Sequence, residues 1–293
     1  MHLLPKFDFY EPDSIAEACK VLAEAKTEGK IIAGGTDIMV NMKKGLLSPK
    51  CLVSLAKIPG LSSVEPITGG IVIGPNLIVA KLLEFDLMRK KFNLLSKAAS
   101  VLGSPLIRNR ATIGGNIVTA RPAADLPPPL MAMGARVVLM KKGKEREFLL
   151  DDFFVGPGQT KIKPTEILAK IIVDDPPPFT GWDYVKLMHR NALEIAIVAV
   201  AVRITLDGPH GTIKDARVIL SAVAAKAIHA VSAEKILIGE KPTEKLFKHA
   251  ASLASTDCTP ITDIRGGAEY RCAMVETLTN RALSAALLQI KGK

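Results

Sequence analysis

The chain has 293 residues, of which 48% are hydrophobic and 23% charged, a composition that excludes a disordered protein and suits about two globular domains. Its formal net charge of +10 admits a nucleic-acid partner, but the basic residues are dispersed and aromatic residues are only 4% of the chain, which leaves little material for base stacking. We therefore expect a basic surface that is solvated or complementary to an acidic partner subunit, and rank nucleic-acid binding last.

The sequence also bears on location. No run reaches the roughly 18 apolar residues of a membrane span. The first residues lack an apolar h-region and meet an acid at Asp8, so we expect no signal peptide and a cytoplasmic protein. The four cysteines form no CxxC pair and are expected to be reduced packing residues: Cys19, Cys51, Cys258 and Cys272.

Taken in chain order, the first 56 residues predict a small β-α-β lobe. Ser14 and Glu17 have the capping-box spacing that begins a helix, which we expect to run to about Ala25. The remaining expected elements of this lobe are a strand at 30–33, a helix at 38–42 and a strand at 51–55.

A second lobe is expected over residues 57–175. Its apolar residues recur at helical spacing, and Gly103-Ser104-Pro105 interrupts that pattern. The expected elements are a strand at 71–73, helices at 79–89 and 93–102, a strand pair at 135–140 and 145–149, and a strand at 166–173.

Asp174-Asp175-Pro176-Pro177-Pro178 is the clearest linker, because three prolines favour stiff, extended backbone. It divides the chain into domains at 1–175 and 179–290. The second domain is expected to contain strands at 183–188, 195–206 and 212–224, which form an antiparallel meander, and then helices at 232–238, 243–255 and 268–290.

Two Gly-Gly segments, at 31–38 and 110–117, each follow an apolar run and are predicted to be turns. Adjacent glycines let another group approach the main chain closely, and the freed N–H groups can form an anion-binding nest. Two such turns are suited to clasp one diphosphate, which indicates a nucleotide cofactor. Either segment alone fits a purely structural turn equally well.

Four stretches, spread in order over nearly the whole chain, resemble one family. They are Ala33 to Asp37, Ile107 to Asn116, Pro122 to Asp125, and Pro260 to Arg271. In these motifs the chain resembles the FAD-binding (medium) subunits of molybdenum hydroxylases, such as the flavoprotein subunits of carbon monoxide dehydrogenase and xanthine dehydrogenase. A single Gly-Gly is weak evidence, whereas the ordered set is highly specific.

The resemblance implies an α+β fold. A two-lobed vanillyl-alcohol-oxidase-like (PCMH-type) FAD-binding domain, with lobes at about 1–56 and 57–175, would precede a C-terminal domain of antiparallel sheet plus helices. It also implies an oxidoreductase subunit that binds FAD non-covalently and passes electrons from the iron–sulfur clusters of a small 2Fe-2S subunit to an external acceptor. A large subunit would hold the molybdenum cofactor, usually in a dimer of heterotrimers (a heterohexamer).

In such a subunit the flavin supplies the chemistry, so we expect no catalytic acid–base pair and no metal ligand in this chain. The flavin domain also lacks the cysteine cluster expected of relatives with an additional four-iron cluster. Arg121 departs from the family, which often has a small or polar residue there. The substrate of the complex and the final electron acceptor stay open.

The resemblance places FAD contacts at eighteen positions, several of which have an equally simple structural interpretation. Asn116 and Asp125 are expected to bind hydroxyl groups; otherwise Asn116 caps a following turn and Asp125 is the N-cap of a helix that begins near Pro127. Lys186 is expected to place a cation near the pyrimidine end of the flavin, or else to face solvent. The full set is Ile31, Ile32, Ala33, Gly34, Gly35, Thr36, Asp37, Ile38, Leu102, Thr112, Ile113, Gly114, Gly115, Asn116, Asp125, Leu168, Tyr184 and Lys186.

Two other classes of function stay open. One is a stand-alone FAD-dependent reductase of the same fold, which would need its own substrate domain with a proton donor. The other is a basic, non-enzymatic scaffold or nucleic-acid binder. Visible flavin absorbance in the purified chain would favour the electron-transfer subunit or the reductase. A colourless protein would favour the scaffold or nucleic-acid binder.

Overall fold

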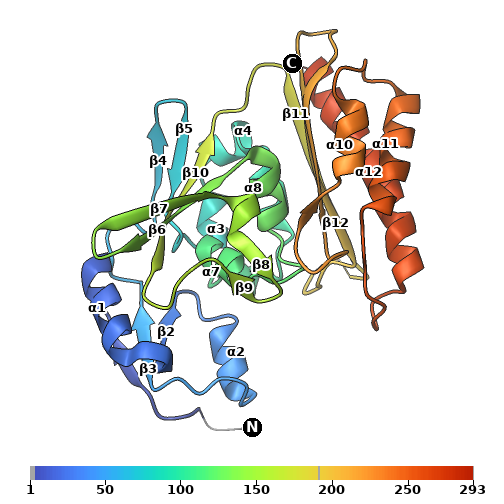
Figure 1. Ribbon diagram of the computed structural model, residues 1–293. Coiled ribbons are helices and arrows are strands. Elements are labelled where there is room, and N and C mark those ends of the chain that lie inside the picture. The colour runs from blue at the N-terminus through green and yellow to red at the C-terminus, as the bar shows by residue number, and fades with distance from the viewer. Residues whose placement is uncertain (1–3, 191, 293) are drawn as a thin grey trace.

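The computed structural model describes residues 4–190 and 192–292. Figure 1 shows three parts in chain order, each built around its own sheet: an N-terminal lobe (residues 8–54), a central lobe (64–174) and a C-terminal domain (180–291). Helices and sheets occur together in every part, which confirms the predicted α+β fold. Within the described residues, every helix is too short or too polar to cross a bilayer.

The N-terminal lobe is a three-stranded parallel sheet with strand order β1-β3-β2. Helix α1 packs on it through Ala18, Cys19 and Leu22, whose spacing places them on one helical face. Ser14 caps α1 by accepting a hydrogen bond from the N–H of Glu17 (3.2 Å). The elements are β1 (Asp8–Tyr10), α1 (Ile15–Ala25), the 3-10 helix η1 (Lys26–Glu28), β2 (Gly29–Ile32), α2 (Ile38–Lys43) and β3 (Cys51–Ser54).

The central lobe is a five-stranded antiparallel sheet of strand order β4-β5-β10-β6-β7, accompanied by short helices and the small β8-β9 hairpin. Its strands are β4 (Val64–Ile67), β5 (Gly70–Ile73), β6 (Arg136–Lys141), β7 (Lys144–Leu149), β8 (Phe154–Gly156), β9 (Gln159–Thr160) and β10 (Ile167–Asp174). Its helices are α3 (Val79–Leu82), α4 (Asp86–Lys90), α5 (Asn93–Ser100), α6 (Pro105–Arg108), α7 (Ile113–Val118), α8 (Pro127–Met133) and α9 (Leu150–Phe153).

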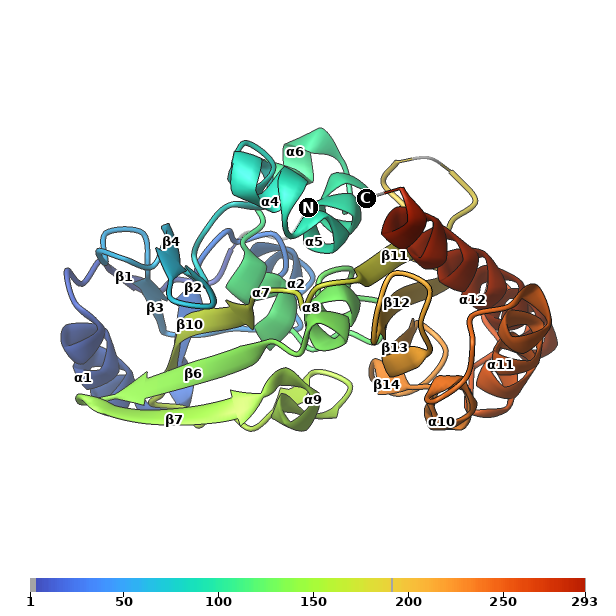
Figure 2. The ribbon, with the colours of Figure 1, turned by 90° about the horizontal axis from the view of Figure 1, so that it is seen from above.

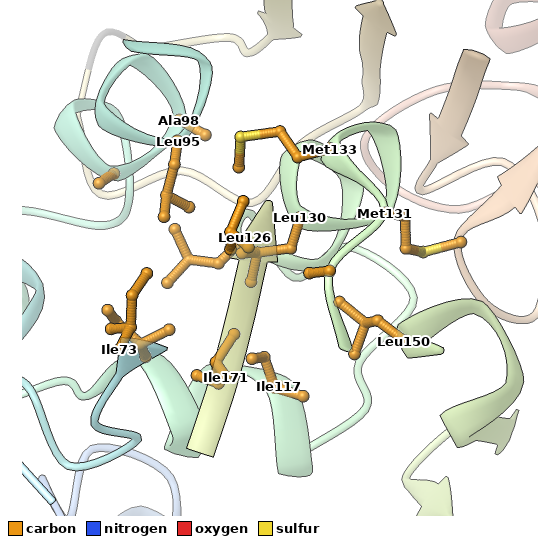
Figure 3. Close-up of a cluster of buried hydrophobic side chains, with 14 of the residues drawn as sticks. Ile73, Leu95, Ala98, Ile117, Leu126, Leu130, Met131, Met133, Leu150 and Ile171 are labelled. Carbon is orange, nitrogen blue, oxygen red and sulfur yellow. The ribbon is translucent and has the colours of Figure 1, made fainter. Parts of the chain in front are cut away.

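Helix α8 is buried along its whole length at the centre of this lobe. Its three prolines occupy the first turn, where a missing N–H costs nothing, and Gly134 ends the helix with a left-handed φ of 74°. Figure 3 shows Leu126 and Leu130 packed among Leu95 of α5 and Ile171 of β10. The proline-rich segment is therefore a core helix and not a loop.

The C-terminal domain is an antiparallel meander of strand order β11-β12-β13-β14, with three helices on one face (Figure 2). Both faces are buried: Val198, Val200 and Val202 pack under the helices, while Ala199 and Ala201 pack toward the central lobe. The elements are β11 (Thr180–Leu187), β12 (Val198–Leu206), β13 (Ile213–Ser221), β14 (Ile228–His229), α10 (Val231–Leu237), α11 (Glu244–Thr256) and α12 (Ala268–Lys291).

Two sequence predictions in the central lobe are wrong. The helix expected at 79–89 is two short helices, α3 and α4, separated by a turn. The second Gly-Gly segment is not a turn, because Gly114 and Gly115 lie in the first turn of α7. The second difference involves contacts between distant segments, because a bridge between Ile78 and Thr112 joins the loop before α3 to the N-terminus of α7.

Candidate cofactor-binding site

Two cavities lie side by side where the three parts of the chain meet. Residues of the N-terminal and central lobes line most of the smaller cavity, of about 580 Å³. Residues of the central lobe and C-terminal domain line most of the larger one, of about 920 Å³. Both volumes are within the usual range for small-molecule sites. The cavities adjoin, because five residues line both of them: Asp37, Leu102, Asn116, Thr119 and Ile195.

The first Gly-Gly segment is a turn between β2 and α2, as predicted, and lines the smaller cavity. Gly35 has a φ of +78°, a conformation that favours glycine. A Cβ on Gly34 would lie 1.9 Å from the carbonyl oxygen of Arg110, so only glycine lets the two lobes meet here. In the described part of the chain, the N–H groups of Gly34, Gly35 and Thr36 have no protein acceptor and are free for an anion.

The second Gly-Gly segment differs from the first, because the N–H groups of both glycines already donate hydrogen bonds within the protein. The N–H of Gly114 donates to the carbonyl of Pro75 (2.7 Å), and that of Gly115 donates to the hydroxyl of Thr112 (3.1 Å), which caps α7. A Cβ on Gly114 would lie 2.6 Å from the Cβ of Pro75. The expectation of two equivalent anion-binding turns is therefore wrong: the second segment provides close packing and a bare surface, not free donors.

Asn116 joins the two cavities and also has a structural role. Its Oδ1 accepts a hydrogen bond from the N–H of Leu126 (3.1 Å), which lies ten positions further along the chain and just before α8. In the described part of the chain its amide nitrogen has no protein acceptor, and the residue lines both cavities. Asn116 can therefore hold α8 with one atom and donate to a ligand with the other.

Asp125 borders the larger cavity and is held from behind by two residues of β11. The ammonium of Lys186 lies 2.9 Å and 3.0 Å from its two carboxylate oxygens, and the hydroxyl of Tyr184 donates to it at 3.1 Å. Lys186 also donates to the carbonyl of Val101 (3.2 Å), and its side chain is only 1% exposed. The three residues form a buried ionic network next to the cavity.

The pKa values of this network follow from its burial. Burial raises the pKa of Asp125, although Lys186 and Tyr184 act in the opposite direction. Burial, followed by the charge of Asp125, raises the pKa of Tyr184 well above its usual value, so Tyr184 stays a neutral donor. Lys186 and Tyr184 line neither cavity, so in this structure they act on Asp125.

Most of the eighteen predicted residues come together around the two cavities. Four do not line them: Ile32 at the end of β2, Ile113 in the core of the central lobe, and Tyr184 and Lys186 behind Asp125. The residues that line at least one cavity are Ile31, Ala33, Gly34, Gly35, Thr36, Asp37, Ile38, Leu102, Thr112, Gly114, Gly115, Asn116, Asp125 and Leu168.

Sequence reasoning missed Thr119 and Ile195, which line both cavities, because neither belongs to a motif. It also gave no role to Arg271, although this residue lies in a quoted motif. Arg271 is 2% exposed and donates to the carbonyl of Ile197 (2.6 Å) and to the carboxylate of Asp263 (2.7 Å). It thereby fixes two segments that border the larger cavity.

Asp263 is held by Arg265 of the same loop and by Arg271 of α12. Hydrogen bonds from Arg265, together with the charges of Arg265 and Arg271, lower the pKa of Asp263 to about 2. The carboxylate is therefore ionised at neutral pH, and its charge neutralises part of the local positive charge. Arg121, also beside this cavity, is exposed.

The residues present fit an FAD molecule. The free N–H groups at Gly34, Gly35 and Thr36 suit a diphosphate, since charge-assisted bonds to an anion are stronger than neutral ones. Apolar side chains such as Ile38 and Leu168 line the smaller cavity, and the polar groups of Asn116 and Asp125 border the larger one. A mostly apolar cavity with a few fixed polar groups is typical of cofactor sites.

Two family descriptions match the chain and together cover most of it. An FAD-binding domain in molybdopterin dehydrogenase matches residues 5–176, and a CO dehydrogenase flavoprotein C-terminal domain matches residues 183–286.

Similar proteins match over nearly their full length. The chain is 31% identical to the carbon monoxide dehydrogenase medium chain of Hydrogenophaga pseudoflava, over 96% of this chain and 97% of that one. It is 32% identical to the glyceraldehyde dehydrogenase medium chain of Sulfolobus acidocaldarius, over 95% of this chain and 97% of that one.

Among solved structures, the fold is similar to that of a carbon monoxide dehydrogenase chain from Hydrogenophaga pseudoflava. The TM-score is 0.94, with 32% sequence identity over 98% of this chain and 99% of that chain.

Proposed function

Because the chain belongs to the family of FAD-binding medium subunits of molybdenum hydroxylases, we propose that it passes electrons from an iron–sulfur subunit, through bound FAD, to an acceptor outside the complex. The observation that supports this most directly is the set of free N–H groups at Gly34, Gly35 and Thr36, at one end of two adjoining cavities. FAD, when bound, supplies the redox chemistry. The protein supplies binding, orientation and electrostatics.

Each part of the site has a separate task in this proposal. The turn at Gly34 and Gly35, with the Thr36 hydroxyl, donates hydrogen bonds to the diphosphate. Gly115 presents a surface without a side chain, so that the cofactor can lie against α7. Leu102 and Leu168 exclude water from apolar parts of the cofactor.

The polar groups beside the larger cavity orient the cofactor. Asn116 donates through its free amide nitrogen, and Asp125 accepts hydrogen bonds from hydroxyl groups. Lys186 and Tyr184 support the Asp125 carboxylate from behind. In this proposal Lys186 acts on the cofactor through Asp125, and not by the direct flavin contact expected from the sequence.

The remaining expectations belong to the same proposal. The partners are a small 2Fe-2S subunit and a large molybdenum-cofactor subunit in a dimer of heterotrimers, which fits the term medium chain that similar proteins have in their names. A net charge of +10 favours association with an acidic subunit. The FAD-binding domain comprises 1–175 and the second domain 179–290. Four free cysteines suit the cytoplasm.

The site is tested with Gly34→Ala, compared with Gly208→Ala, where a Cβ would meet nothing within 4 Å. Because the added Cβ at Gly34 overlaps a backbone carbonyl, we expect FAD affinity to fall by about tenfold or more, a loss of about 1.4 kcal/mol. FAD content is measured by absorbance and chromatography of the heat-released cofactor, and folding by circular dichroism. A folded Gly34→Ala chain that binds FAD as tightly as Gly208→Ala does would contradict the site.

The electron route is tested separately. The FAD-loaded chain is mixed with a chemically reduced 2Fe-2S small subunit, and loss of flavin absorbance near 450 nm is followed. We expect reduction only when the small subunit is present. Rapid reduction of a free organic substrate by the chain alone, with a nicotinamide donor, would favour the stand-alone reductase.

A further inference from the structure

Two of the four cysteines are adjacent in space. The sulfur atoms of Cys258 and Cys272 lie 3.2 Å apart, although 14 positions separate them in sequence. Cys258 follows α11, and its thiol donates to the carbonyl of Ser255 (3.1 Å), while Cys272 lies in the first turns of α12. Both are free thiols. A disulfide needs its sulfurs about 2.05 Å apart, so a movement of roughly 1 Å would join them.

The segment between the two cysteines borders the larger cavity. Thr259, Ile261 and Asp263 line that cavity, and Arg271 fixes Asp263 immediately before Cys272. Ile264 in the same loop is fully exposed, while Asp263 beside it is held by Arg265 and Arg271. A covalent link between Cys258 and Cys272 would therefore close a loop that borders the larger cavity.

We propose that Cys258 and Cys272 form a dithiol site that small-molecule disulfides, such as oxidised glutathione, convert to a protein disulfide. The Cys272 thiolate attacks one sulfur of oxidised glutathione, which forms a mixed disulfide and releases one glutathione. Cys258 then loses its proton and attacks the sulfur of Cys272, which releases the second glutathione. The two protein thiols are oxidised by two electrons, and one glutathione disulfide is reduced to two thiols.

The environments of the two thiols set the order of these steps. Cys258 is 9% exposed, whereas Cys272 is partly exposed and is the one that an oxidant reaches first. Burial, together with the neighbouring Cys272, raises the pKa of the Cys258 thiol to about 12. Since the thiolate is the nucleophile, the second step is slow at neutral pH and accelerates as the pH rises.

To test the proposal, the full-length chain or its complex is incubated with oxidised glutathione. It is then denatured in the presence of a thiol-blocking reagent. Titratable thiols are expected to fall from four to two. Tryptic digestion without reductant should give one linked pair, residues 249–265 joined to residues 272–281, with a mass 2 Da below the sum of the two peptides.

Matched variants make the result specific. Cys258→Ser and Cys272→Ser each remove one thiol, and neither should yield an intramolecular disulfide. The Cys51→Ser variant changes a cysteine in the distant N-terminal lobe. It should keep the link between Cys258 and Cys272, and its titratable thiols should fall from three to one. The linked chain should also have a higher thermal midpoint than the reduced chain, because the disulfide restricts the unfolded state.

Either of two outcomes would overturn the proposal. One is a thiol count that stays at four while a dithiol control peptide oxidises fully under the same conditions. The other is a link that joins a different pair, such as Cys19 with Cys51.

Discussion

Protonated His229 is expected to make the stability of this protein fall as the pH rises from about 6.5 to 9. The residue lies on β14, and its two ring nitrogens contact carboxylates on either side: Nε2 is 2.9 Å from Asp151 of α9, and Nδ1 is 2.7 Å from Glu234 of α10. Because α9 belongs to the central lobe and α10 to the C-terminal domain, the imidazole links two parts of the chain.

The magnitude follows from the pKa. Burial lowers the pKa of His229, but hydrogen bonds and charges from Asp151 and Glu234 outweigh burial and raise the pKa from 6.5 to about 9. At 1.36 kcal/mol per pKa unit, this shift corresponds to at most about 3.4 kcal/mol. The side chain is 26% exposed, so solvent screening reduces the effect, and we expect about 1–2 kcal/mol.

The sign follows from proton linkage. The folded protein binds the proton more tightly than the unfolded chain, so the full contribution is present below pH 6.5. It is lost as the pH rises through about 9, where the folded protein also releases the proton. His229→Gln should remove this pH dependence and lower stability mainly on the acidic side of the window.

The assay is urea unfolding at pH 6 and pH 9.5 with saturating FAD in every sample, because a ligand that binds only the folded state adds its own stability. The unfolding free energy of the wild type, relative to His229→Gln, should fall by about 1–2 kcal/mol between the two pH values. His249→Gln, at an exposed position on α11, is the control and should behave as the wild type. Identical pH dependence in the wild type and His229→Gln would refute the reasoning.

Three other substitutions have defined expectations. Lys186→Met leaves Asp125 buried without its cation, so urea unfolding should show a loss of about 3–5 kcal/mol, and a loss under 1 kcal/mol would mean that the pair is not buried in solution. Thr112→Val removes the cap of α7 and should cost about 1 kcal/mol by the same assay, whereas Thr112→Ser should cost little. Arg271→Met removes the donors that fix Asp263, so amide hydrogen exchange at 259–267 should quicken; unchanged exchange would show that the loop is held by other contacts.

Local chemistry made several features predictable from the sequence. The cap at Ser14 and the long helix α12 were predictable from capping and periodicity, and the strand expected at 195–206 corresponds to β12. The Gly34-Gly35 turn was predictable as well, because its left-handed φ needs glycine. These are properties of a residue and its near neighbours.

Other features depended on contacts between distant segments. The sequence Gly114-Gly115 looks the same as Gly34-Gly35, yet Pro75 and Thr112 take up its N–H groups. Similarly, Lys186 looked like a cofactor contact, but Asp125 lies 61 positions away and receives its ammonium group. Neither outcome could be read from local pattern, because the deciding partner belongs to another element.

The sequence by itself determined the main strands and helices of the C-terminal domain, the first glycine-rich turn and the family, since these depend on local conformational preferences and on motifs in a fixed order. Only the tertiary structure decided which backbone donors stay free for a ligand, which charged side chains neutralise one another, and that Cys258 and Cys272 meet. The physical reason is that a buried polar group takes whichever partner packing brings within reach, and packing joins residues that the sequence keeps apart.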